Sequence, residues 1–173
     1  MTFYYFVNFK LIPSYFEAQR GRFLRNAQAG DGRFFQQIYQ ATYERGVIQG
    51  DSKQERHFTP EDFQVHDLDM GEDRRVLVIT LPPPAEFESE ECMLCLAYAV
   101  PYREVDGKLQ IGEIYTVEQS KPSENDPLKG VFDLFSEEDM IFLGVMSDKG
   151  HRNLGHVTRD PQNIAEAVCR VTF

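Results

Sequence analysis

The stretch FQVHDLDMGEDRRVLVITL, residues 63–81, decides the fold predicted for this chain. Residues 63–70 form an extended run, residues 71–74 hold a glycine and charged residues, and residues 75–81 are rich in Val, Ile and Leu. Two extended runs joined by a short turn predict a β-hairpin. The second run lacks the alternation of a half-exposed strand, so we expect a sheet strand that is covered on both faces. Three prolines follow and end the strand, because proline has no N–H donor for a sheet ladder.

More short extended runs follow this hairpin. Asp106-Gly107 is a strong turn signal, because this dipeptide readily takes the positive φ angles of a type I′ turn. It separates two predicted strands, and a polar turn near residues 147–150 separates two others. These predicted strands cover residues 92–100, 109–118, 140–146 and 153–157.

Helical patterns lie before and after the predicted strands. Ser14 and Glu17 form a capping-box pattern, which predicts a helix over residues 14–28. An apolar stripe at helical spacing predicts a second helix over residues 33–45, and a short helix is expected within residues 131–139. Asp160 followed by proline is typical of a helix start, so we expect a terminal helix there with its apolar residues turned inward.

These patterns predict an α+β fold, in which an N-terminal helical hairpin packs on an antiparallel, meander-like sheet of about five or six strands and a short C-terminal helix follows. A chain of 173 residues fits one domain. We expect residues 1–48 to be mainly helical and residues 62–173 to be mainly antiparallel sheet with the terminal helix.

The net charge is −10, and 25 of the 28 acidic residues lie after residue 48. A field of this sign repels phosphate backbones and anionic membranes, so nucleic acid and membrane are not expected as partners. It favours a basic protein partner. The densest acidic stretch predicts an exposed loop, whose candidate partner-binding residues are Glu86, Glu88, Glu90 and Glu91.

The three cysteines, Cys92, Cys95 and Cys169, are an odd number for a disulfide framework and fit a reducing compartment. No apolar run approaches the roughly 18 residues of a membrane helix, and the apolar N-terminus lacks a basic region ahead of it. We therefore expect an unexported, cytoplasmic protein. Cys92 and Cys95 have the C-x-x-C spacing of redox and zinc sites, but they begin a predicted strand, so we expect a buried or edge position instead.

His151, His156 and Asp148 form the densest cluster of catalytic residue types, with Asp160 nearby. Imidazole is a natural general base near neutral pH, and a carboxylate can orient it. No nucleophile in a recognisable motif accompanies these residues. The same residues are typical of a β-turn and a strand edge, and the sequence leaves both interpretations open.

Asp67 and Asp69 project to one face of a predicted strand, and two such carboxylates can hold Mg²⁺ or Ca²⁺ if Glu113 from another strand joins them. A half-exposed strand produces the same alternation, so the pattern does not by itself establish a metal site. No cofactor is expected, because neither a P-loop nor a strand-bound G-x-G-x-x-G motif occurs.

The leading hypothesis is a small interaction protein that binds a basic protein through its acidic surface. The alternative is a small-ligand-binding or hydrolytic enzyme with a cone-like pocket between helices and sheet, an analogy at the level of fold only. A structural homodimer is a third possibility. Convergence of His66, Asp67 and Asp69, or of the two C-terminal histidines, in one cavity would favour an enzyme.

Overall fold

The computed structural model describes residues 20–38, 60–82, 92–121, 127–147 and 150–173. Its centre is a seven-stranded sheet in the order β1-β2-β3-β5-β6-β7, with β4 paired to β3 outside this path. All pairings are antiparallel. The strands are β1 (Gln64–Asp69), β2 (Arg74–Thr80), β3 (Cys92–Val105), β4 (Lys108–Ile111), β5 (Tyr115–Lys121), β6 (Ile141–Ser147) and β7 (Gly150–His156).

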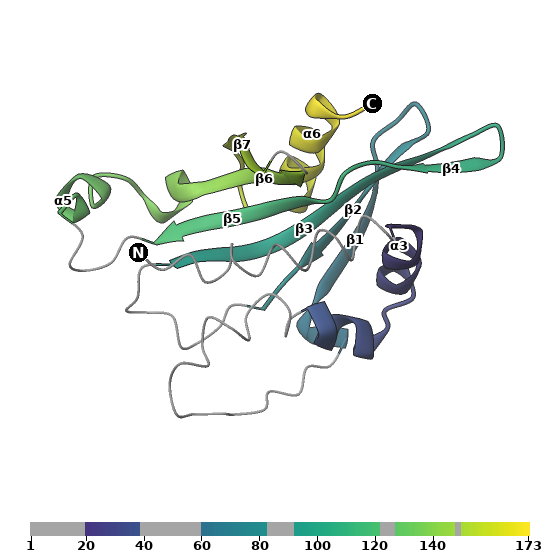
Figure 1. Cartoon of the computed structure of the whole chain (residues 1–173), viewed down its shortest axis with the longest axis horizontal. Coiled ribbons are helices and arrows are strands. Elements are labelled where there is room, and N and C mark those ends of the chain that lie inside the picture. The colour runs from purple at the N-terminus through teal and green to yellow at the C-terminus, as the bar shows by residue number, and fades with distance from the viewer. Residues whose placement is uncertain (1–19, 39–59, 83–91, 122–126, 148–149) are drawn as a thin grey trace.

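Helices lie on both faces of this sheet (Figure 1). α3 (Arg20–Gln28) and a helical segment over residues 32–38 form the N-terminal pair. On the other face α6 (Pro161–Val171) packs against β1, β2 and β3. The short elements are η1 (Pro60–Asp62), α5 (Lys129–Phe132) and η2 (Glu137–Met140). The predicted α+β class, with a helical pair, an antiparallel sheet and a short terminal helix, is confirmed.

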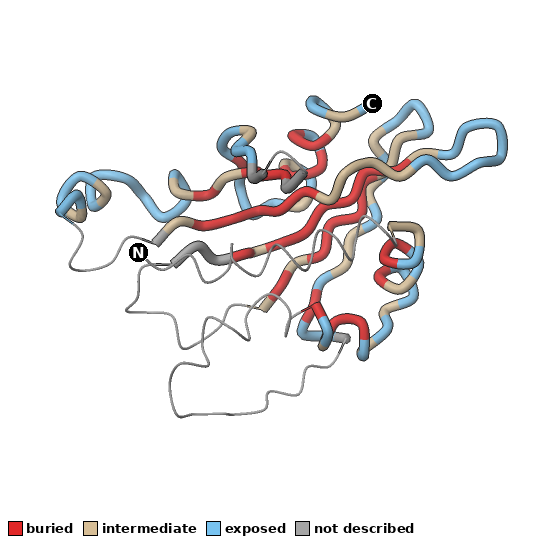
Figure 2. The backbone as a smooth tube through the Cα atoms, in the orientation of Figure 1, coloured by how far each residue is buried: buried red, intermediate tan, exposed pale blue. Residues whose placement is uncertain are grey.

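Each face of β2 contributes to a different core, as the sequence predicts. Leu77 and Ile79 belong to the cluster beneath the N-terminal helices, whereas Val76 and Val78 belong to the cluster beneath α6. All four are 0% exposed. Figure 2 shows this burial running along the middle of the central strands. A β2 strand covered on both faces therefore explains the unbroken apolar run.

Aromatic packing holds the N-terminal helical pair in place. Phe23 of α3 lies edge-on to Phe34, with ring centroids 5.0 Å apart, and Phe35 stacks on Phe63 at 4.7 Å. Aromatic pairs in these geometries stabilise more than their buried area alone. The predicted helix start at residues 14–19, the rest of the second predicted helix and the N-terminal extended segment lie outside the described residues.

Residues 109–118, predicted as one strand, are divided between β4 and β5. The break at residues 112–114 lies opposite Pro101 of β3, which has no N–H to give to the neighbouring strand. The carbonyl of Pro101 still accepts a bond of 2.8 Å from Gly112 N. A Cβ on Gly112 would lie 2.8 Å from Pro101 Cγ, so only glycine fits this close approach. The sheet therefore has one strand more than predicted.

The predicted Asp106-Gly107 turn and the terminal helix are confirmed in detail. Asp106 and Gly107 have φ angles of 52° and 73°, the left-handed pair that a type I′ turn requires. Asp160 caps α6 by accepting a bond from Gln162 N at 3.2 Å, and Pro161 is the first helical residue. No helix in the described part of the chain is long and apolar enough to cross a membrane.

Candidate functional site

The structure places the catalytic candidates on an edge strand. His156 ends β7 and is exposed, with its ring 4.5 Å from that of Phe142 on β6. His151 pairs with Met146 in the same hairpin, and Asp148 lies outside the described residues. β7 is at one end of the strand order and β1, with His66, is at the other. The two groups of candidates therefore lie at opposite ends of the strand order.

The metal candidates are each engaged by arginine. Asp67 and Asp69 share one face of β1, as predicted, and both lie beside Arg75 of β2, at 3.1 and 3.7 Å. Glu113 lies elsewhere and forms an ion pair of 3.1 Å with Arg20 of α3. Within the described residues no group of three or more His, Cys, Asp or Glu side chains could hold a metal ion.

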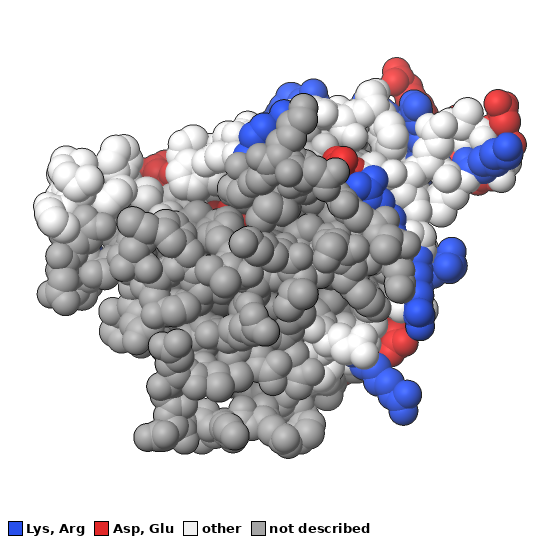
Figure 3. All heavy atoms as spheres, in the orientation of Figure 1, with Lys and Arg blue, Asp and Glu red and all other residues white. Residues whose placement is uncertain are grey.

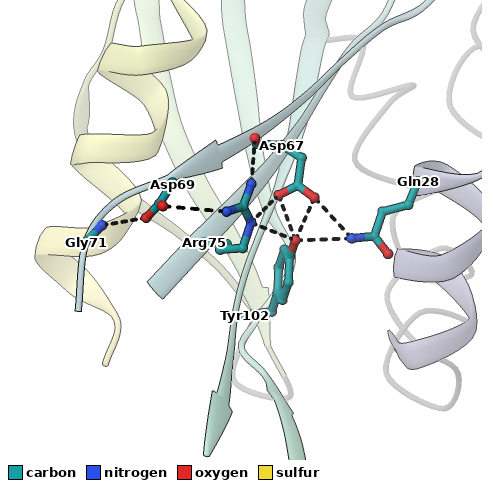
Figure 4. Close-up of polar contacts among 6 residues, drawn as sticks. All are labelled: Gln28, Asp67, Asp69, Gly71, Arg75 and Tyr102. Carbon is teal, nitrogen blue, oxygen red and sulfur yellow. Dashed lines mark hydrogen bonds and ion pairs between the residues drawn. The ribbon is translucent and has the colours of Figure 1, made fainter. Parts of the chain in front are cut away.

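Asp67 lies at the centre of a polar cluster, which we call the Asp67 cluster: Gln28, Asp67, Asp69, Arg75 and Tyr102 (Figure 4). The Tyr102 hydroxyl lies 2.7 and 2.6 Å from the two carboxylate oxygens of Asp67. Arg75 Nε and Gln28 Nε2 each donate to that carboxylate at 3.1 Å. Because these donors occupy both of its oxygens, Asp67 acts as a structural acceptor that joins α3 to three strands.

The environment of the cluster shifts two pKa values. Burial, followed by the hydrogen bond to Asp67, raises the pKa of Tyr102. Hydrogen bonds to Tyr102 and Asp67 raise the pKa of Arg75, so its positive charge is held firmly. The register explains the cluster, because Asp69 pairs with Arg75 and Arg75 pairs with Tyr102 across the three strands. The sequence predicted the shared face of the two aspartates but not this arginine and tyrosine.

A second polar group is buried in the middle of the sheet. Thr116 and Glu118 of β5 are 3% and 2% exposed, and the threonine hydroxyl donates to the Glu118 carboxylate at 2.8 Å. Cys95 of β3 pairs with Glu118 in the register. Burial, and then the negative charge of Glu118, raises the pKa of the Cys95 thiol, so the thiolate form needed for redox or nucleophilic chemistry is suppressed. Cys95 is thus the buried strand cysteine that was predicted.

The connection between β5 and β6 contains a concentration of exposed apolar side chains that sequence reasoning missed. We call residues 127–140 the β5–β6 segment. It includes α5 and η2 and carries exposed acidic residues in addition to the apolar ones. In Figure 3 uncharged atoms cover the end of the molecule where α5 lies, with acidic atoms beside them. The exposed large apolar residues of this segment are Leu128, Val131, Leu134 and Phe135.

The predicted acidic loop cannot be placed on this surface, since Glu86, Glu88, Glu90 and Glu91 lie outside the described residues. Comparison with known proteins gives no further guide to the site. The chain matches no family model, and no curated protein or solved structure matches it significantly. The function must therefore be argued from this chain's own residues.

Proposed function

We propose that this chain is an interaction protein that binds a basic protein partner through an acidic surface. The single observation that carries the proposal is the β5–β6 segment, where four acidic residues and one lysine accompany four exposed apolar side chains. Charged residues at the rim of an interface steer a partner of opposite sign, while apolar residues at its centre supply affinity. The net charge of −10 extends the same preference over long range.

The arrangement of the other candidates also supports binding rather than catalysis. The carboxylates of the metal candidates are paired with arginine. The C-terminal histidine candidates lie on β7, at the other end of the strand order from β1. General acid–base chemistry requires such groups within hydrogen-bond reach of one reacting atom. The candidates on β1 and those on β7 lie at opposite ends of the strand order, which favours the binding proposal over a catalytic site shared between them.

The test is affinity purification of the tagged protein from the cells that produce it, followed by mass spectrometry. One bait carries Glu137→Gln and Glu138→Gln, both on exposed residues of η2. A matched control bait carries Glu104→Gln and Asp106→Asn at the β3–β4 hairpin, where asparagine tolerates the positive φ of 52° at residue 106. The same number of charges is thus removed at two places on the molecule.

We expect a Lys/Arg-rich protein to be recovered with the native and control baits and to be reduced several-fold with the Glu137/Glu138 bait. Recovery should also fall in about 1 M salt, where the Debye length is about 3 Å. A bait with Glu86, Glu88, Glu90 and Glu91 changed to Gln measures the contribution of the predicted acidic loop. If no basic protein is recovered with the native bait, the proposal is wrong, and a ligand pocket becomes the next hypothesis.

A further inference from the structure

The β5–β6 segment concentrates exposed apolar surface in a way that the rest of the described chain does not. Eight large hydrophobic residues are exposed in the described residues, and four of them lie between residues 128 and 135. Leu134 is 83% exposed, and Leu128, Val131 and Phe135 are each more than half exposed. Single exposed apolar residues are ordinary, but four within eight residues of sequence are a candidate interaction surface.

Backbone hydrogen bonds hold this segment in a defined shape. The amides of Val131 and Phe132 both donate to the carbonyl of Leu128, at 2.9 and 3.0 Å. The amides of Leu134 and Phe135 continue the same pattern by donating to Val131 and Phe132, at 3.2 and 3.0 Å. A segment that is ordered before binding loses less conformational entropy when a partner docks.

A capping box then joins the apolar residues to η2. The Ser136 side chain accepts from Asp139 N at 3.3 Å, and Ser136 N donates back to the Asp139 carboxylate at 3.0 Å. η2 packs against β5, so the segment is anchored to the sheet at this end. The exposed apolar residues therefore lie directly before a capped turn that contacts the sheet.

The charges around these side chains select the kind of partner. The exposed acidic residues of the segment are Asp133, Glu137, Glu138 and Asp139. Lys129, the one basic residue there, is already paired with Asp133, the C-cap residue of α5. An anionic lipid surface would repel this rim. A second copy of the chain would bring the same acidic rim and a net charge of −10 against it.

We infer that the β5–β6 segment is the docking site for a basic protein surface, in which Leu134 and Phe135 contact an apolar stripe flanked by lysine or arginine. This inference rests on the proposed function and adds the position of the interface and the apolar nature of the contact. Exposed leucine and phenylalanine side chains beside acidic residues require both complementary charge and complementary apolar area on the partner.

The first probe is a synthetic 18-residue helical peptide with a leucine stripe flanked on both sides by lysine. A peptide of the same composition in scrambled order has the charge but not the stripe. Both are titrated by fluorescence anisotropy against the native chain, Leu134→Ser/Phe135→Ser and Leu109→Ser. Leu109 is 48% exposed on β4 and serves as the matched control. The single variant Leu134→Ser, at the most exposed position of the segment, is titrated in the same way. Circular dichroism checks that every variant is folded.

We expect the striped peptide to bind the native chain at least tenfold more tightly than the scrambled peptide. The double variant should weaken striped-peptide binding at least tenfold, Leu134→Ser should weaken it several-fold, and Leu109→Ser should leave it unchanged. Equal binding of the two peptides would overturn the apolar docking site while leaving a charge-driven interaction protein intact. Equal loss in the Leu109 variant, or no binding at about 1 mM peptide, would also overturn the docking site.

Two further arms distinguish other occupants of the segment. Co-sedimentation with vesicles of phosphatidylcholine, alone or mixed with phosphatidylglycerol, detects a lipid surface. Sedimentation velocity of the native chain and the double variant detects self-association. Vesicle binding or dimer formation that depends on Leu134 and Phe135 would contradict a basic protein as the occupant, whereas neither event is expected.

Discussion

Replacing Tyr102 with phenylalanine removes one hydroxyl from the Asp67 cluster and leaves the ring in place. That hydroxyl lies 2.7 and 2.6 Å from the carboxylate oxygens of Asp67, 3.1 Å from Gln28 Nε2 and 3.3 Å from Arg75 Nε. A hydrogen bond to a charged group contributes roughly 1.5–3 kcal/mol to the free energy of unfolding. Asp67 keeps its bonds from Arg75 and Gln28, and its side chain is 33% exposed, so water can replace part of the loss.

We therefore expect Tyr102→Phe to lower the free energy of unfolding by about 1.5–2 kcal/mol, near the lower end of the range for such bonds. For a chain of this length, that corresponds to a fall in Tm of roughly 3–8 °C. Urea unfolding of the native chain, Tyr102→Phe, Asp67→Asn and the double variant gives a thermodynamic cycle. A coupling near zero between residues 67 and 102, or a Tyr102→Phe loss below about 0.5 kcal/mol, would refute the structural role of the hydroxyl.

The pH dependence of the same variant provides an independent check. Burial and then the Asp67 hydrogen bond raise the pKa of Tyr102, so the folded state keeps its phenolic proton after the unfolded state has lost it. Ionisation of Tyr102 therefore leaves the free energy of unfolding unchanged well below pH 10 and lowers it as pH rises from about 10 through the raised pKa. Tyr115, whose pKa is also raised by burial, adds to this fall. Tyr102→Phe should therefore reduce the slope between about pH 10 and 11, and an unchanged slope would contradict the assignment.

Three further predictions concern individual side chains. Cys95 is 1% exposed, and burial raises the pKa of its thiol. Iodoacetamide at about pH 8 should therefore leave Cys95 unmodified in the native protein and label it in urea. Peptide mapping that shows labelling of the native protein would contradict this burial. Asp160→Ala removes the acceptor for Gln162 N and should lower the free energy of unfolding by about 1 kcal/mol. Asp160→Asn should lower it by less, because asparagine also caps helices. Equal losses of unfolding free energy in the two variants would argue against capping. Hydrogen bonds from the Ser136 side chain, then from its backbone, lower the pKa of Asp139. The capping box should therefore persist above about pH 4 and be lost only as pH falls through that lowered pKa. Hydrogen exchange over residues 136–139 that already accelerates at about pH 5–6 would show that the capping box does not hold the turn.

The elements that local chemistry determines could be predicted from the sequence. The run from Val76 to Ile79 has no polar face, and the structure buries it on both sides. Asp106-Gly107 takes the positive φ angles that this dipeptide tolerates, and Asp160 caps the terminal helix. In each case a few neighbouring residues carry the information, so no knowledge of distant contacts is needed.

Features that depend on strand pairing could not be predicted in the same way. The interruption between β4 and β5 follows from Pro101 on the opposite strand, which the sequence of residues 109–118 does not show. The same holds for the Asp67 cluster. The alternation of Asp67 and Asp69 suggested a metal site, but only the register shows that Arg75 lies beside both carboxylates.

The candidate interface was the least predictable part of the molecule. A short helix is the sequence-based expectation for residues 131–139, where the structure has α5 at Lys129–Phe132 and η2 at Glu137–Met140. In the structure Leu134 and Phe135 are 83% and 54% exposed. The local sequence does not distinguish an apolar residue that packs in the core from one that contacts a partner, because both are apolar side chains in or beside a helix.

Site-specific photocrosslinking in the cells that produce this protein tests the proposed interface most directly. A benzophenone amino acid is placed at Phe135, and at Leu109 as the control position, because both side chains are about half exposed. The account predicts that position 135 crosslinks to a Lys/Arg-rich protein, at an apolar site on that protein, and that position 109 does not. Crosslinking of the same protein from position 109 but not from position 135 would contradict the claim that the β5–β6 segment is where this chain binds its partner.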